Sequence, residues 1–303
     1  MGDQMLLESA DAFGGDLAQY RGELLIHCYR MLGTLDEAED AVQEAFARAW
    51  KGRQTFQRSI SFRAWLYRIA TNVCLNAIEV RQRDRVVIDP YPDHLWSGIA
   101  EPGAGPEARY DAHESISLAF LTVLQLLPPR QRAVLLLRDV LTFRATEVAA
   151  LLDMSVAAVN SAHQRARATL RGSYRSPANS SNPGNLLKRY VRVWEAADVA
   201  GLVALLREDA VLTMPPKPMV TGAGQIGNFI GKAIFTIAPM RLLAAQANGS
   251  PAFAAYTRER GSNRFVPFAL LVISTDGRQI TQIDAFADPR VLARFELPAE
   301  LAG

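Results

Sequence analysis

Residues 151–171, LLDMSVAAVNSAHQRARATLR, decide how the middle of this chain folds. Two short helical patterns meet there at Asp153–Met154–Ser155. Ser155 is a good N-cap for the second helix, and Asp153 tolerates the left-handed backbone that a tight corner between helices needs. The stretch therefore predicts a helix-turn-helix, whose second helix usually enters the major groove of DNA.

The second helix has two unlike faces. An apolar stripe should pack on the preceding helices and makes His163 a core histidine: Val156, Val159, His163, Ala166 and Leu170. The other face carries amide, hydroxyl and guanidinium groups suited to base edges and phosphates. A solvated face normally mixes charge signs, whereas no acid follows Asp153 here, so DNA contact is favoured. The candidate residues for DNA contact are Ser155, Asn160, Ser161, Gln164, Arg165, Arg167 and Arg171.

Charge is segregated along the chain, although the formal net charge is only +2. Arg48–Arg85 holds nine basic residues and two acids, and Pro128–Arg175 holds eight basic residues and three acids. Thr34–Glu44, in contrast, holds five acids and no base. Such segregation is expected where some surfaces meet a polyanion and others do not. With 303 residues and a hydrophobic fraction of 49%, the chain can form two or three domains with real cores.

The two cysteines, Cys28 and Cys74, lie in apolar helical patterns and in no Cys-x-x-Cys or Cys/His spacing. Buried free thiols are favoured over a disulfide or a metal pair, and no cofactor or metal site is expected. The first residues, MGDQMLLESADAF, carry acids where a secretory signal needs bases, and no run of about 18 apolar residues occurs. We therefore expect a cytoplasmic protein without a membrane partner.

Residues 10–85 have the pattern of helices. In the helix over 36–50, a stripe at helical spacing should face a core: Ala38, Ala41, Val42, Ala45, Phe46 and Ala49. Thr34 can cap this helix, and the acids at its start suit the positive end of the helix dipole. In the following helix, over 61–83, the predicted core-facing residues are Phe62, Trp65, Leu66, Ile69, Val73 and Ala77.

Proline and glycine divide the rest of the chain. Residues 86–111 form a linker, yet some of its residues are expected to dock on another part of the protein: Tyr91, Pro92, Leu95 and Trp96. Residues 112–172 form a compact helical unit, and 173–184 form a second linker. Residues 185–303 begin with a helical stretch and continue in short runs that favour strands. The predicted fold is multidomain, with two all-α domains followed by an α+β domain.

Two sets of motifs resemble those of extracytoplasmic-function sigma factors, which give bacterial RNA polymerase its promoter specificity. LGTLDEAEDAVQEAFARAW and FRAWLYRIATNVCLNAI resemble region two, which binds core polymerase and the −10 promoter element. LPPRQRAVLLLRDVLTFRATEVAALLDMSVAAVNSAHQRARATL resembles region four, which reads the −35 element. The resemblance covers about residues 10–172. His163 stands where an apolar residue is usual and Asn76 where an acid is common, and neither breaks a motif.

The resemblance implies roles for two surfaces of the region-two part. An acidic helix face would contact a helical coiled coil in the β and β′ subunits of core polymerase, through Asp36, Glu39, Asp40, Gln43 and Glu44. The loop over 52–61 and the adjacent helix would capture melted −10 bases, because a positive groove with aromatic platforms holds single-stranded DNA. The candidate −10 contacts are Phe56, Arg58, Arg63, Asn72 and Asn76, whereas Phe62 and Trp65 are expected in the core.

The linker DPYPDHLW and the tail RYVRVWEAADVAGLVALLREDAVLTMPP resemble the subgroup that carries a SnoaL-like domain of the NTF2-like fold. Relatives in that fold catalyse proton transfer with an Asp or His, but this tail has no histidine and no visible acid–base pair. Asp284 is able to face a pocket, although an edge or capping role is favoured. We expect no catalytic residue and a tail that modulates activity in cis, since a tethered domain has a millimolar effective concentration. An anti-sigma factor and a small ligand stay open as partners.

Three interpretations compete. The leading one is a sigma factor, which binds core RNA polymerase and promoter DNA and is not an enzyme. A helix-turn-helix regulator acting without polymerase leaves the helices over 36–50 and 62–85 without a role. A helix-turn-helix section fused to an NTF2-like isomerase, hydrolase or ligand-sensing domain is disfavoured by the absence of histidine from the tail.

Overall fold

The computed structural model describes residues 13–15, 17–56, 61–81, 88–95, 116–173, 184–215, 217–259 and 261–302. Contacts divide the chain into two compact units. The helical unit comprises residues 1–88 and 96–175, and the C-terminal unit comprises 89–95 and 176–303. We call the segment 89–95 the strap; it belongs to the C-terminal unit although its neighbours in sequence belong to the helical unit. No helix within the described ranges is long and apolar enough to cross a membrane.

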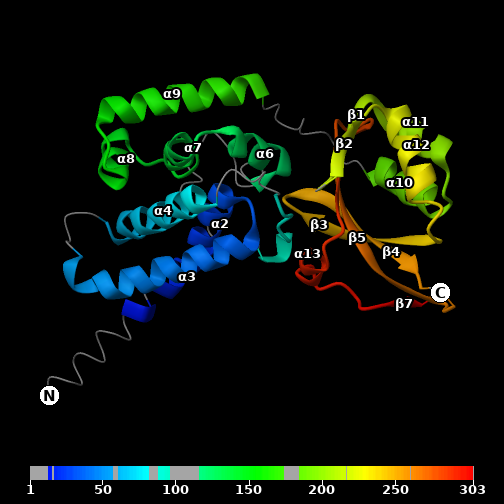
Figure 1. Ribbon diagram of the computed structural model, residues 1–303, viewed down its shortest axis with the longest axis horizontal. Helices are drawn as coiled ribbons and strands as arrows, with labels where there is room; N and C mark the ends of the chain where they lie inside the picture. The colour runs from blue at the N-terminus through cyan, green and yellow to red at the C-terminus, as the bar shows by residue number, and fades with distance from the viewer. Residues whose placement is uncertain are drawn as a thin grey trace, which may run out of the picture. The chain divides into compact units, whose positions relative to one another are not determined.

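Among the described residues, three helices lie in the first half of the helical unit: α2 (Arg21–Leu32), α3 (Leu35–Gly52) and α4 (Phe62–Val80) (Figure 1). They pack against one another, and a short helical turn, η1 (Arg53–Thr55), follows α3. The predicted stripe of α3 is buried, except that Phe46 is half-buried. Thr34 is the N-cap residue, but its hydroxyl donates to the Glu37 carboxylate (2.7 Å) and accepts no backbone N–H.

The core face of α4 differs from the prediction. Leu66 and Val73 are buried, but Phe62, Trp65 and Ile69 are half-buried and Ala77 is exposed. The side of α4 that faces α2 is buried instead: the Thr71 hydroxyl lies 2.9 Å from His27 Nε2, and the Cys74 thiol is hydrogen-bonded to Cys28. Both cysteines are buried free thiols, as predicted. The buried face of α4 is therefore rotated toward α2 relative to the predicted stripe.

Within the described range 116–173, the second half of the helical unit has four helices and a π-helical turn: α6 (Leu118–Leu126), α7 (Pro129–Leu135), η3 (Leu136–Val140), α8 (Ala145–Leu152) and α9 (Val156–Ser173). Ser117 caps α6 by accepting the N–H of Phe120 (3.2 Å). Pro129 opens α7, at a position where a missing N–H leaves no helical bond unmade. α9 packs on α6, α7 and α8 with one face, which is buried, and its opposite face is exposed.

The C-terminal unit is a seven-stranded sheet with helices over one face, which confirms the predicted α+β domain. The strand order is β2-β1-β6-β5-β4-β3, with β7 paired to β5, and only the β1–β6 pair is parallel. The strands are β1 (Leu206–Met214), β2 (Lys217–Thr221), β3 (Met240–Ala247), β4 (Ser250–Arg258), β5 (Arg264–Thr275), β6 (Ile280–Phe286) and β7 (Leu301–Ala302). The helices are α10 (Gly184–Glu195), α11 (Val199–Leu205), α12 (Ala223–Ala233) and α13 (Pro289–Ala293).

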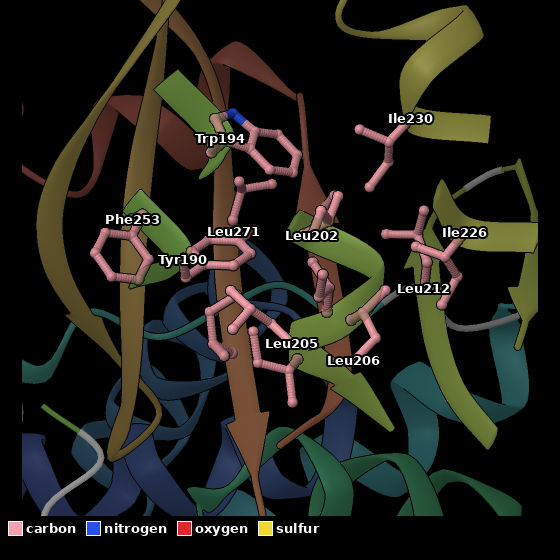
Figure 2. Close-up of a cluster of buried hydrophobic side chains, with 14 of the residues drawn as sticks. Tyr190, Trp194, Leu202, Leu205, Leu206, Leu212, Ile226, Ile230, Phe253 and Leu271 are labelled. Carbon is pink, nitrogen blue, oxygen red and sulfur yellow. The ribbon is translucent and has the colours of Figure 1, made fainter. Parts of the chain in front are cut away.

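One hydrophobic core joins α10, α11 and α12 to the sheet (Figure 2). Tyr190 and Trp194 of α10 lie beside Phe253 of β4, with ring centroids 5.6 Å apart for Tyr190 and Phe253. Alternate strand residues face this core, among them Ile283 and Ala285 of β6. The residue between them, Asp284, therefore points to the other face of the sheet.

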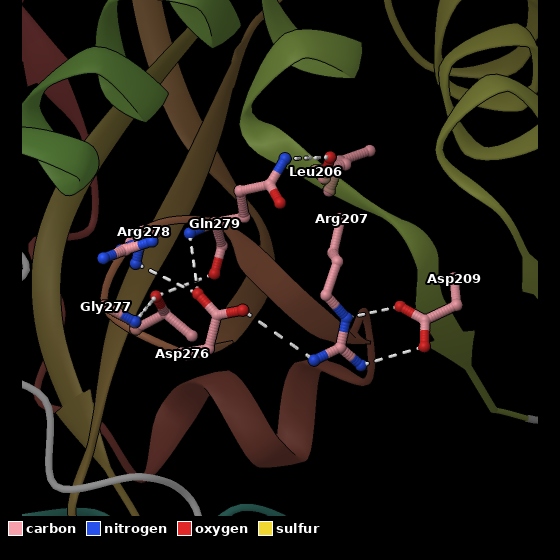
Figure 3. Close-up of polar contacts among 8 residues, drawn as sticks. Leu206, Arg207, Asp209, Asp276, Gly277, Arg278 and Gln279 are labelled. Carbon is pink, nitrogen blue, oxygen red and sulfur yellow. Dashed lines mark hydrogen bonds and ion pairs between the residues drawn. The ribbon is translucent and has the colours of Figure 1, made fainter.

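The turn between β5 and β6 is fixed by polar contacts that tie it to β1 (Figure 3). Asp276 accepts the N–H groups of Gln279 (2.9 Å) and Arg278 (3.0 Å), and these bonds lower the pKa of the Asp276 carboxyl. The Gln279 amide donates to the Leu206 carbonyl (3.1 Å), and the Arg207 guanidinium lies 3.8 Å from the Asp276 carboxylate. These contacts hold the start of β1 beside the end of β5.

Candidate nucleic-acid interface

The corner between α8 and α9 has helix-turn-helix geometry. Asp153 adopts the left-handed backbone that the sequence predicted (φ 53°). Ser155 accepts the N–H of Ala158 (3.1 Å) and so caps α9, again as predicted. The Ser155 hydroxyl, which the sequence also offered to DNA, is thereby bound to the protein. The corner and the cap together set the direction in which α9 leaves α8.

α9 exposes a polar face and buries the opposite one. Its buried residues are Val159, Ala162, Ala166 and Leu170. Its exposed residues include Asn160, Ser161, Gln164, Arg165, Ala168 and Arg171. Val156 was predicted to be buried and is 39% exposed, because the packed stripe begins one turn later at Val159. α9 contains no acid, so the exposed face carries only neutral and positive side chains.

Two residues of α9 face a buried carboxylate. Asp139 of η3 is 5% exposed, and its two oxygens lie 2.8 Å from His163 Nε2 and 3.8 Å from Arg167 Nε. The His163 side chain is 14% exposed, in agreement with a core histidine. Arg167 is 25% exposed and faces Asp139, so it lies apart from the exposed face on which the sequence placed it.

The acidic face predicted on α3 lies at the surface. Asp36, Asp40, Gln43 and Glu44 are exposed, and Glu39 is half-buried. Glu44 pairs with Arg48 on the same helix (2.7 Å). The five residues follow the turn spacing of a helix, so they form one face opposite to the buried stripe. An exposed, mainly acidic helix face of this kind suits a basic or polar protein partner.

The predicted −10 contacts are not all equally accessible. Phe56 packs in an aromatic cluster with Phe62 and Trp65, at ring-centroid distances of 5.6 Å and 5.1 Å. Arg63 pairs with the buried Glu23 (3.1 Å), and its guanidinium lies 4.9 Å from the centre of the Tyr67 ring. Both side chains are half-buried. Arg58 lies outside the described residues.

Asn72 and Asn76 are exposed on α4, as a DNA contact requires, and the structure adds Arg68 to them. Arg68 is exposed one turn before Asn72, so the three side chains form a stripe at four-residue steps. Sequence reasoning omitted Arg68, although its spacing from the two asparagines carries the signal. This stripe joins a cation to two amides on one helix face.

Three protein-family models match the chain in order: Sigma-70 region 2 over residues 17–85, Sigma-70 region 4 over residues 117–170, and a SnoaL-like domain over residues 187–295. The ECF RNA polymerase sigma factor SigG of Mycobacterium tuberculosis is 38% identical over 329 residues, covering 97% of this chain and 87% of SigG. The chain belongs to the extracytoplasmic-function (ECF) sigma factors.

Of two further comparisons, the first agrees with this membership and the second shows the fold. The ECF RNA polymerase sigma factor SigW of Bacillus subtilis is 33% identical over 165 residues, covering 53% of this sigma factor and 88% of SigW. The crystal structure of the sigma factor SigJ of Mycobacterium tuberculosis superposes with a TM-score of 0.64 at 24% identity, covering 94% of this chain and 100% of the SigJ chain. The fold is therefore shared over regions two and four and the C-terminal domain. The protein is a sigma factor that binds core RNA polymerase and promoter DNA, and not an enzyme.

Regions two and four of the sigma factor contact each other within the helical unit. Arg132 of α7 is buried and donates to the carbonyl of Met31, at the C-terminal end of α2. The Gln125 amide donates to the neighbouring Arg30 carbonyl (3.4 Å). Burial lowers the pKa of Arg132 to about 10, so the guanidinium stays charged at neutral pH. Region four thus supplies donors to the carbonyls that end a region-two helix.

A second contact between these regions involves one of the −10 candidates. The ring of Phe143, between η3 and α8, lies 5.6 Å from the Tyr67 ring and 5.2 Å from the Arg63 guanidinium. Tyr67 also donates to Glu23 (3.1 Å), and burial is the main cause that raises the Tyr67 pKa. The Arg63 side chain is therefore enclosed by residues of both regions.

The strap pairs with the turn between β3 and β4. The N–H of Tyr91 donates to Asn248 Oδ1 (2.7 Å), and the N–H of Asn248 donates to the Tyr91 carbonyl (2.9 Å). The N–H of Gly249 donates to Asp93 (2.9 Å), and Pro92 forms an isolated bridge with the end of β3. Tyr91 is 0% exposed and Asn248 is 1% exposed. The sigma factor thus adds a piece of its central linker to the sheet of its C-terminal domain.

The four docking residues predicted in this linker differ in position. Tyr91 and Pro92 are buried in the C-terminal unit. Leu95 is 41% exposed, and Trp96 lies outside the described residues. Main-chain groups, rather than the apolar side chains on which the prediction relied, make most of the bonds that hold the strap.

Asp284 has neither of the roles favoured from the sequence. It lies in the central strand β6, not at an edge or a helix cap, and is 5% exposed. It accepts the Thr213 hydroxyl (2.5 Å) and the Gln282 amide (2.8 Å), while burial raises its pKa. Because Asp284 points away from the helix-covered core, it does not supply an acid to that core.

Proposed function

We propose that this sigma factor reads the −35 element with the exposed face of α9. The observation that carries the proposal is a helix face, at a helix-turn-helix corner, whose side chains are all neutral or positive. A major groove admits one α-helix, and amides and guanidinium groups pair there with base edges. The proposed contacts are Asn160, Ser161, Gln164, Arg165 and Arg171. Ser155, which caps α9, and Arg167, which faces Asp139, make contacts within the helix-turn-helix and are not among the proposed DNA contacts.

The −10 element is assigned to the exposed stripe of α4 and the loop before that helix. Arg68, Asn72 and Asn76 are accessible, and Arg58 is retained from the sequence. Phe56 and Arg63 become available to DNA when their present packing partners move away. The acidic face of α3, through Asp36, Glu39, Asp40, Gln43 and Glu44, is the proposed contact with the β and β′ subunits.

The packing of region two on region four describes a resting state. The names of the two elements place them about 25 base pairs apart, or roughly 85 Å along B-DNA at 3.4 Å per base pair. A compact body of about 150 residues has a diameter of roughly 40 Å. Regions that touch through Arg132 and Phe143 cannot occupy both elements together. Promoter binding therefore requires the two regions to separate.

The C-terminal domain regulates this separation in cis by holding the strap. The strap lies in the connection between regions two and four, and its Tyr91 is completely buried in the C-terminal unit. A domain that binds the middle of a connection limits how far its two ends can move apart. An anti-sigma factor or a small ligand that released the strap would change this limit.

In vitro transcription tests the function as a whole. Full-length protein is added to core polymerase, start sites are mapped, and the α9 and strap variants described below are compared with the wild type. Deletion of residues 185–303 tests the C-terminal domain, and unchanged transcription with unchanged core affinity would exclude regulation in cis. The proposed place of action is the cytoplasm, where the polymerase works.

A further inference from the structure

One buried carboxylate contacts two residues of α9 that lie one helical turn apart. Asp139 lies in η3, the π-helical turn that ends α7. Its Oδ1 is 2.8 Å from His163 Nε2, and its Oδ2 is 3.8 Å from Arg167 Nε. π-helical turns are rare and frequently occur at functional sites. We call Asp139, His163 and Arg167 the α9 clip.

The clip lies beside the face that α9 exposes. Gln164 and Arg165 follow His163 directly, and both are exposed. A side-chain tip lies roughly 6 Å from the axis of a helix, so a roll of about 20° displaces it by about 2 Å, which is enough to break a hydrogen bond to a base. The rotation of α9 must therefore be fixed closely for these residues to discriminate between bases.

The apolar contacts of α9 do not fix this rotation by themselves. Two of its four buried residues are the alanines Ala162 and Ala166, whose methyl groups offer little shape to resist a roll. A hydrogen bond is directional and weakens steeply with angle. The hydrogen bond between His163 and Asp139 therefore constrains rotation in a way that the alanines do not, and the Arg167 guanidinium, 3.8 Å from the same carboxylate, adds an ion pair one turn further along.

We propose that Asp139 is a positioning residue for −35 recognition, acting through His163 and Arg167. This rests on the proposed function, in which α9 reads the −35 element. The clip touches no base; it sets the angle at which Gln164 and Arg165 meet the groove. A residue with a purely structural role would change the amount of folded protein and leave the choice between DNA sequences unaltered.

The test uses holoenzyme assembled from core polymerase and the full-length chain. Wild-type holoenzyme selects its promoter from randomised DNA, and binding to the selected sequence is compared with binding to the same fragment with a scrambled −35 element. His163→Leu removes the bond to Asp139 but suits a mostly buried position, so the protein should remain folded. His163→Gln is the matched control, because its amide can still donate to Asp139.

We expect His163→Leu to reduce the ratio of the two affinities about tenfold, the size of one misplaced base contact, and His163→Gln to stay within about twofold of the wild type. Thermal unfolding should show that His163→Leu is less stable than the wild type, because the buried Asp139 loses a hydrogen bond, but that it is still folded at the temperature of the binding assay. A wild-type ratio in His163→Leu, or a parallel loss of both affinities, would overturn the proposal.

Arg165→Ala, measured in the same assay, separates this proposal from the proposed function on which it rests, namely that α9 reads the −35 element. If Arg165→Ala lowers the ratio of the two affinities and His163→Leu does not, only the proposal that the α9 clip positions α9 is rejected. If Arg165→Ala also leaves the ratio unchanged, α9 does not read the −35 element, and both proposals are rejected.

Discussion

Arg165 is an exposed cation on a helix that contains no acid, and it lies two residues after His163 of the clip. Arg165→Ala should weaken promoter binding by about 1–3 kcal/mol if it meets a base edge, and lower the slope of log affinity against log salt by about 0.9 if it meets a phosphate. Holoenzyme binding to a promoter fragment at several salt concentrations measures both effects. Arg189→Ala, on the exposed side of α10, is the control and should change neither.

His27 makes region two sensitive to acid. Burial, aided by the charges of Arg30 and Arg63, lowers the His27 pKa from 6.5 to about 3. His27 therefore becomes protonated near pH 6.5 in the unfolded chain but only near pH 3 in the folded chain. The free energy of unfolding consequently falls as the pH drops from about 6.5 to about 3. The free energy of unfolding should decrease by about 2 kcal/mol between pH 8 and pH 5 from this residue alone.

Urea unfolding at both pH values measures this loss. His27→Gln removes the titrating group, so its stability should depend less on pH by the same amount. An identical pH dependence in the two proteins would contradict the assignment. Far-UV circular dichroism of His27→Gln at pH 8 checks that the variant still folds.

The sequence predicted individual residues well where the neighbours are local. The cap at Ser155, the left-handed Asp153 and the exposed amides of α9 all follow from spacing within one or two helical turns. Arg63 and Phe56 were harder, because Arg63 is held by Glu23, 40 residues earlier, and by Phe143 of region four. Spacing along a helix does not reveal such partners.

At the scale of the element, the corner between α8 and α9 depends on backbone conformation. Asp153→Val should lower the free energy of unfolding by about 1–2 kcal/mol, since a β-branched residue tolerates left-handed backbone poorly. Asp153→Gly should stay within about 0.5 kcal/mol of the wild type, because glycine adopts this conformation without strain. Urea unfolding of the wild type and the two variants measures these differences in the free energy of unfolding. Equal losses for valine and glycine would mean that the Asp153 side chain, rather than the backbone, holds the corner.

The elements of the sheet were predictable in kind but not in arrangement. Short runs within residues 185–303 indicated strands, and β5 and β6 lie there. The parallel pairing of β1 with β6 joins segments more than 70 residues apart, and no local pattern encodes it. The Asn248–Gly249 pair is a strong hairpin signal, because both residues have positive φ (55° and 67°) as a two-residue turn requires, and it went unused.

At the scale of the whole molecule, the attachment of the strap can be weakened by one substitution. Asn248→Gly keeps the left-handed turn but removes the oxygen that accepts the Tyr91 N–H. Loss of one buried hydrogen bond costs about 1 kcal/mol, so amide exchange at Tyr91 should become about fivefold faster. Transcription by the holoenzyme should change with it.

Asn248→Asp is the matched control for this release. Aspartate retains an acceptor oxygen and tolerates left-handed backbone, so exchange at Tyr91 should remain close to the wild type. Hydrogen exchange followed by mass spectrometry reports on residues 89–95 in the full-length protein. If transcription is the same in both variants while exchange differs, the strap does not mediate the regulation.

The order of domains along the chain was predictable, whereas the membership of the strap was not. Proline and glycine marked residues 86–111 as a linker, and its apolar residues suggested docking. The partner of Tyr91 lies 157 residues further along the chain, and on the strap the bonds to it use only the main-chain N–H and carbonyl of Tyr91, which leave no trace in side-chain patterns. Only the folded sheet identifies it.

Pairing across 157 residues also has a consequence during synthesis. A ribosome adds about 5–20 residues per second, so Tyr91 is made roughly 8–30 s before Asn248. At the start of that interval region two has already been made, region four is made during it, and the connection between them stays unbound throughout. During this interval core polymerase can therefore bind a newly made copy before its own C-terminal domain has been synthesised.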